Sequence, residues 1–119
     1  MNKVLCFGGR DYQERIKIAA ALERVLSSFD GEPFAIIQGG ARGADRLCGE
    51  WGALYGFPVI EVRANWEYYG RAAGSTRNVW MAEICSPDYA VGFPGGSGTR
   101  HMESQCRARK IPLWLPYGS

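Results

Sequence analysis

The chain has 119 residues, 46% of them hydrophobic and 22% charged, and its net charge at pH 7 is +2. This size and composition are typical of one folded domain, so we expect residues 1–119 to form a single domain and exclude a fibrous repeat or a disordered tail. The apolar runs are too short for a membrane-spanning helix, and the first residues lack the length and cleavage site of a signal peptide. We therefore expect a cytoplasmic protein that makes no contact with a membrane.

Five short apolar runs predict β-strands that are buried on both faces of a sheet. In chain order they cover residues 4–7, 34–37, 58–62, 89–93 and 111–115. Apolar residues at helical spacing predict helices near residues 18–29, 44–55, 75–84 and 98–110, and residues 63–74 form the one long connection. This alternation predicts a Rossmann-like α/β fold with three layers (α/β/α), whose five-stranded parallel sheet has the strand order 3-2-1-4-5.

The last predicted helix has a thin apolar face, in which Met102 and Cys106 are the clear apolar anchors. We expect this helix to cover a sheet edge or to pack against another subunit. We also expect the protein to form a homodimer or a higher homo-oligomer. The four cysteines form no Cys-x-x-Cys pair and His101 is the only histidine, which argues against a structural zinc site. We therefore expect no metal and no other cofactor, and we interpret the cysteines as reduced thiols in or near the core.

Three of the predicted strands end in glycine-rich turns. The clusters are Gly8 and Gly9, then Gly39, Gly40 and Gly43, and finally Gly95, Gly96 and Gly98. All three lie at one edge of a parallel sheet, where the backbone can approach an anion and helix N-termini offer free N–H groups. Arginines are well suited to phosphate, and they make up 11 of the 14 basic residues. The alternative is that each glycine merely permits a tight turn.

The third cluster, the run Pro94-Gly95-Gly96-Ser97-Gly98-Thr99, is neither a dinucleotide-binding G-x-G-x-x-G nor a Walker A loop. Ser97 and Thr99 add hydroxyl donors to a run of backbone amides, which suits a monophosphate or another compact anion.

This run resembles the signature of the SLOG superfamily, which joins the DNA-processing protein DprA with the LOG nucleoside-monophosphate phosphoribohydrolases. Together with residues 8–12, 39–45 and 65–78 it resembles the small YspA-like branch of that superfamily. The resemblance extends over essentially the whole chain. It implies a Rossmann-like fold with a nucleotide or nucleotide-derived ligand bound over the strand ends.

The likeness to LOG enzymes implies a role for Arg77 and places the catalytic glutamate of those enzymes on this sequence. The stretch Arg77-Asn78-Val79-Trp80-Met81 is similar to their Arg-Lys-x-x-Met, which implies that Arg77 grips a ligand phosphate or sugar, with Asn78 in place of the lysine. The catalytic glutamate of LOG enzymes falls at Met102, and the neighbouring Glu103 is turned about 100° around the helix. A thioether cannot replace a carboxylate, so the departure argues against LOG-type glycosidic cleavage.

Residues 39–45 are similar to a block of DprA, which places Arg42 and Gly43 at the opening of the second helix, where they could contact phosphate. Asp45 either complements the dipole of that helix or accepts hydrogen bonds from ribose hydroxyls. Arg10 and Asp11 follow the first strand. Asp11 is either a functional carboxylate or the N-cap of the first helix.

Aromatic residues in the long connection could stack on a base, or could anchor the loop or a dimer interface. Among Trp66, Tyr68 and Tyr69 we favour Tyr69, because Arg71 would bring a charge to the same rim. We interpret His101 as a surface residue rather than a ligand contact, and Asp88 as structural.

These residues indicate a binding module for a nucleotide or nucleotide-derived ligand of the mononucleotide or ADP-ribose type, acting as a sensor or a signalling or processing module. No catalytic residue is assigned. The first alternative is an N-glycosidic hydrolase that uses Asp11 or Asp45 in place of the missing glutamate. The second alternative is DprA-like binding of single-stranded DNA, which the near-neutral charge disfavours.

Overall fold

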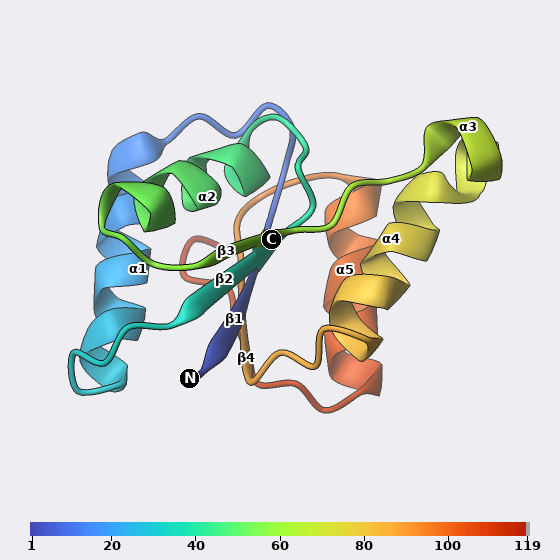
Figure 1. Cartoon of the computed structure of the whole chain (residues 1–119). Helices are drawn as coiled ribbons and strands as arrows, with labels where there is room; N and C mark the ends of the chain where they lie inside the picture. The colour runs from blue at the N-terminus through green and yellow to red at the C-terminus, as the bar shows by residue number, and fades with distance from the viewer. Residues whose placement is uncertain (119) are drawn as a thin grey trace.

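A computed structural model of the chain describes residues 1–118. Within that range, five parallel strands form one sheet in the order β3-β2-β1-β4-β5, of which Figure 1 labels the first four. The strands are β1 (Lys3–Phe7), β2 (Ala35–Gln38), β3 (Val59–Glu61), β4 (Tyr89–Gly92) and β5 (Leu113–Trp114). The predicted Rossmann-like fold and its strand order are confirmed.

Helices cover both faces of the sheet, so the predicted three layers are present. One face carries α1 (Arg15–Ser28) and α2 (Ala44–Leu54), and the other carries α4 (Ala73–Glu83) and α5 (Ser97–Ala108), as Figure 1 shows. Over residues 1–118, every helix is too short or too polar to cross a membrane.

The strand residues alternate between two separate apolar clusters, as the pleat of a strand requires. In β1, Val4 and Cys6 pack beneath α1 and α2, whereas Leu5 and Phe7 pack beneath α4 and α5. Burial of side chains of this size contributes about 1.5–3 kcal/mol each to the free energy of unfolding. Each cysteine is a free thiol in the part of the chain that the structure describes, and three of the four are buried.

The expectation that every strand is buried on both faces is wrong for the two edge strands. Both residues of β5 are only partly buried. All three residues of β3 are exposed, including Val59 and Ile60. The reason is that β3 lies at the edge of the sheet, where it has β2 on one side only. At the opposite edge, α5 packs against β4 and β5, so the thinly apolar helix covers a sheet edge as predicted.

The long connection is more regular than the sequence suggested. It contains α3 (Trp66–Tyr69) and a short 3-10 helix, η1 (Gly70–Ala72), which leads into α4. The side chain of Asn65 caps α3 by accepting a hydrogen bond from the Tyr68 N–H at 3.0 Å. This segment extends from the body of the fold beside α4, as Figure 1 shows.

Candidate functional site

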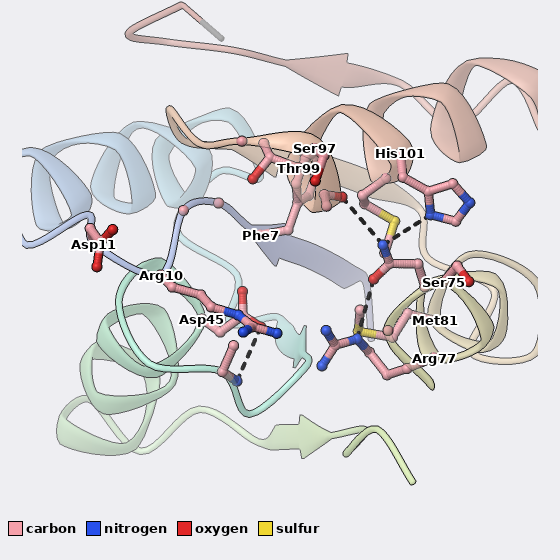
Figure 2. Close-up of a pocket in the computed structure, with 18 of the residues that line it drawn as sticks. Phe7, Arg10, Asp11, Asp45, Ser75, Arg77, Met81, Ser97, Thr99 and His101 are labelled. Atoms are coloured by element: carbon pink, nitrogen blue, oxygen red, sulfur yellow. Dashed lines mark hydrogen bonds between the residues drawn. The ribbon is translucent and has the colours of Figure 1, made fainter. Parts of the chain in front are cut away.

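The carboxyl end of β1 opens into a cleft of about 680 Å³, here called the central cavity. Its walls are the turn after β1, the start of α2, one face of α4 and the first turn of α5 (Figure 2). Twelve of the nineteen predicted ligand-binding residues line it: Gly8, Gly9, Arg10, Asp11, Asp45, Arg71, Arg77, Asn78, Gly96, Ser97, Gly98 and Thr99.

Several glycines hold the three glycine-rich turns against one another. A Cβ on Gly8 would lie 2.7 Å from that of Ala44, and the Gly9 N–H donates to the Pro94 carbonyl at 3.0 Å. Gly43 has a φ of +81° and sits against the carbonyl oxygen of Gly9. A Cβ on Gly95 would lie 2.6 Å from the Gly9 nitrogen. Pro94, Gly95 and Gly43 line neither the central cavity nor the second cavity described below, so the tight-turn interpretation describes them best.

The first turn of α5 presents unpaired backbone donors to the central cavity. Gly96 is its N-cap and supplies no side chain, while its carbonyl already accepts from the Arg100 N–H. The N–H groups of the three residues before Arg100 therefore have no acceptor inside the helix. A Cβ on Gly96 or Gly98 would meet no described atom within 4 Å, so both positions face open space.

Arg77 reaches the same cavity from α4 and is fixed in place. Its Nη1 donates to the Gly39 carbonyl at 2.6 Å, and its Nε donates to Oδ1 of Asn78 at 3.2 Å. Only 9% of the residue is exposed. Burial lowers the pKa of its guanidinium, Asp45 opposes that effect, and Arg10 lowers the pKa further. An arginine nevertheless stays charged, so the cavity holds a fixed positive charge.

Asp45 faces Arg77 across the cavity, as Figure 2 shows. Its Oδ2 accepts hydrogen bonds from the N–H groups of Gly39 at 3.1 Å and Ala41 at 3.4 Å. Asp45 therefore closes the turn between β2 and α2 as well as lying in the first turn of the helix. Burial raises the pKa of Asp45 to about 6, although Arg77 and the two N–H groups oppose the rise.

Asn78 joins α4 to the first turn of α5. Its amide nitrogen donates to the Gly98 carbonyl at 3.3 Å and lies 3.1 Å from Nδ1 of His101. The interpretation of His101 as a surface residue is wrong, because it is half-buried and lines the central cavity. The missing information was its contact with Asn78, a partner 23 residues away in the sequence.

Met102 also lines the central cavity, at the position of the catalytic glutamate in LOG enzymes. Glu103 does not line it. It is buried on another side of α5, with Oε1 3.5 Å from the Arg107 guanidinium. Glu103 is thus turned away from the central cavity, as its place one residue after Met102 on the helix predicts.

Asp11 lies at the margin of the cavity and points away from the other labelled side chains in Figure 2. Its side chain is 94% exposed and pairs with Arg42 at 3.3 Å. The N-cap of α1 is Glu14 and not Asp11, because the chain makes a further turn before the helix begins at Arg15. The N-cap alternative for Asp11 is therefore wrong.

The aromatic residue over the strand ends is Trp66 and not the favoured Tyr69. Tyr69 lies outside the lining of the central cavity and packs edge-on against Trp80, with ring centroids 5.6 Å apart, so it anchors the connection. Trp66 is half exposed and the Arg10 guanidinium lies 5.8 Å from the centroid of its ring. The α3 turn decides which ring faces the cavity, and the sequence had indicated no helix there.

A second cavity of about 600 Å³ adjoins the central cavity on the β3 side and is here called the arginine cavity. The two cavities share Arg10, Ala41, Trp66 and Arg77. Three further predicted residues line the arginine cavity, namely Gly39, Gly40 and Arg42. It also includes Arg46 and Arg63, which the sequence interpretation did not single out.

A family model and two known proteins match this chain. A family model described as the YspA, cpYpsA-related SLOG family matches residues 2–69. The Gene 61 protein of Mycobacterium phage D29 is 34% identical over 122 residues, which cover 95% of this chain and 94% of that protein. Among solved structures, a predicted subunit of tRNA methyltransferase from Methanocaldococcus jannaschii is similar with a TM-score of 0.38 and 13% identity. That match covers 100% of this chain and 69% of the other.

Proposed function

Because the chain belongs to the YspA, cpYpsA-related SLOG family, we propose that it binds a nucleotide or nucleotide-derived ligand in the central cavity. The ligand is of the mononucleotide or ADP-ribose type, and binding serves a sensing or signalling role. The observation that carries the proposal is one convergence: the free amides at the start of α5 and the buried guanidinium of Arg77 line the same cavity.

A phosphate fits the amide end of this cavity. The positive end of a helix dipole and unpaired N–H groups favour an anion there. Ser97, Thr99 and the exposed residue Arg71 also line the cavity, and their hydroxyls and guanidinium are further donors. Arg77 adds a charge that is already desolvated and held by Gly39, so binding requires little reorganisation.

The remaining surfaces suit a sugar and a base. Oδ1 of Asp45 is free of the bonds that Oδ2 makes to the β2–α2 turn, so it can accept from ribose hydroxyls. The half-exposed ring of Trp66 at the mouth provides a face on which a base can stack, worth about 1–3 kcal/mol.

The test is a thermal-shift and titration panel at low salt with AMP, GMP, CMP and ADP-ribose. A ligand at 100 times its dissociation constant adds about 2.7 kcal/mol to the free energy of unfolding, a shift of several degrees for a domain of this size. We expect a selective shift, and we expect the Arg71→Gln variant to weaken it. The control Arg24→Gln removes a charge from α1, which lines neither cavity. No shift with any nucleotide would refute the proposal.

A second candidate is N-glycosidic hydrolysis, which the pKa of Asp45 favours. A carboxyl group with a pKa of about 6 can donate or accept a proton near neutral pH, and this one faces the cavity. The test is release of free base from nucleoside monophosphates at high protein concentration, by the wild type and by Asp45→Asn. Release that Asp45→Asn abolishes supports hydrolysis, whereas no free base from the wild type refutes it.

A further inference from the structure

The arginine cavity is lined by positive side chains from four separate segments of the chain. Among the described residues, its lining contains five arginines and no carboxylate: Arg10, Arg42, Arg46, Arg63 and Arg77. Parallel pairing explains the convergence. Gln38 at the end of β2 pairs with Glu61 at the end of β3, so the turns that follow these strands lie side by side.

Two of these arginines have carboxylate partners outside the cavity, and both partnerships are weak. Arg42 pairs with Asp11, and Arg63 pairs with Glu61. The four side chains are between 36% and 94% exposed, and exposed pairs of this kind contribute about 0–1 kcal/mol. A phosphate could therefore recruit either guanidinium at little cost.

The other three arginines have no carboxylate oxygen within 4 Å in the range 1–118. Arg46 is exposed at the rim, whereas Arg10 and Arg77 stand at the boundary with the central cavity. Arg10 and Arg77 lie close enough to repel, because Arg10 lowers the pKa of Arg77. The Asp45 carboxylate interacts favourably with both guanidinium groups, and a phosphate at the boundary would add a second anionic partner for them.

We propose that the ligand spans both cavities and carries at least two phosphoryl groups. One lies at the first turn of α5, and the other lies among Arg42, Arg46 and Arg63. Trp66 lines both cavities and can stack on a base or shield the link between the phosphoryl groups. This inference rests on the proposed function and narrows its ligand to a pyrophosphate-linked or phosphodiester-linked nucleotide.

A small ligand fits these observations better than a nucleic-acid strand. Basic residues exceed acidic residues by only two over the whole chain. The arginines gather around one bounded cavity of about 600 Å³ and not along a stripe that a strand could follow.

The experiment is calorimetric titration of the whole chain at low salt with four probes. AMP carries one phosphate, ADP-ribose carries a pyrophosphate, 5′-phosphorylated diadenylate carries a phosphodiester, and a hexanucleotide represents single-stranded DNA. The test variant is Arg46→Gln with Arg63→Gln, because neither residue lines the central cavity. The matched control is Lys17→Gln with Arg24→Gln, which removes two positive charges from α1.

We expect ADP-ribose or the diadenylate to bind the wild type about tenfold tighter than AMP, which is about 1.4 kcal/mol. The test variant removes that advantage and leaves AMP unchanged, and the control leaves both affinities unchanged. Equal affinity for AMP and both two-phosphate probes overturns this inference but leaves the proposed function standing. A hexanucleotide that binds about tenfold tighter than the diadenylate overturns it in favour of nucleic acid. Failure of AMP, ADP-ribose and the diadenylate to bind the wild type refutes the proposed function itself.

Discussion

The substitution Gly96→Asp should move stability and ligand affinity in opposite directions. Gly96 is the N-cap of α5 with a φ of −101°, which any residue can adopt, and no described atom lies within 4 Å of the position of its Cβ. An aspartate there can accept hydrogen bonds from the free N–H groups of the first turn. It should stabilise the fold by a few tenths to about 1 kcal/mol, which raises the melting temperature by roughly 1–4 °C.

The same carboxylate would occupy the place proposed for a phosphate. At a separation of about 5 Å and an effective dielectric constant of about 20, two unit charges repel by about 3 kcal/mol, which corresponds to roughly a hundredfold loss of affinity. Gly96→Asn has the same size and caps the helix in the same way, so the difference between the two variants isolates the charge.

The assay is thermal unfolding of the three proteins, followed by titration of AMP at low salt, where screening is weak. We expect both variants to melt at or above the wild-type temperature. We expect the Gly96→Asp variant to bind AMP far more weakly than the Gly96→Asn variant. If the Asp variant binds AMP as tightly as the Asn variant, the phosphate does not lie at the first turn of α5, and the reasoning fails.

Three further predictions concern Asp45, the glycine-rich turns and self-association. Burial holds the pKa of Asp45 at about 6 in the folded chain, above its usual 3.8, so the folded state binds more protons and stability falls as pH rises from about 4 to about 6. In urea unfolding, the free energy of unfolding of the wild type should fall by up to about 3 kcal/mol over that pH range relative to the Asp45→Asn variant. Identical pH profiles of the two proteins would show that folding does not raise the pKa of Asp45. Gly43→Ala should lower the free energy of unfolding by more than about 2 kcal/mol, because φ is positive there and the new Cβ would meet the Gly9 carbonyl. Gly56→Ala is the control: its φ is +77° and the space around it is open, so only the backbone strain of about 1 kcal/mol is expected. If urea unfolding shows that both variants lose the same free energy of unfolding, close approach of the glycine-rich turns does not contribute to stability. Light scattering should give at least twice the 13.2 kDa mass of the chain, as expected for a homo-oligomer, and a monomer would contradict that expectation.

The fold could be predicted from the sequence because local signals and topology agree. Short apolar runs alternate with helical patterns, and a glycine-rich turn follows each of the first, second and fourth strands. The parallel arrangement then brings the glycine clusters to one edge. Gly9 contacts Pro94, Gly43 and Gly95 there, which is why these turns need glycine.

The site could be predicted only where a residue's position followed from that topology or from the family resemblance. Arg77 and Asn78 line the cavity as the resemblance implied. His101 could not be placed, since its partner Asn78 lies on a different helix and only packing of α4 against α5 brings the two together.

The same limit applies to the long connection and to the arginine cavity. The Asn65 cap starts a helix that turns Tyr69 toward Trp80 and leaves Trp66 at the mouth. Arg46 lies in α2 and Arg63 lies in the connection after β3, and they line one cavity only because β3 pairs beside β2 at the edge of the sheet.

The central claim is that a nucleotide phosphate binds at the first turn of α5, beside Arg77. The most direct measurement is a titration of AMP into isotope-labelled protein, followed by the amide and guanidinium resonances in two-dimensional NMR spectra. The account predicts that the largest shifts occur at the amides of Ser97, Gly98 and Thr99 and at Nε of Arg77. Saturable binding that leaves these resonances unmoved, with shifts confined to other parts of the chain, would contradict it.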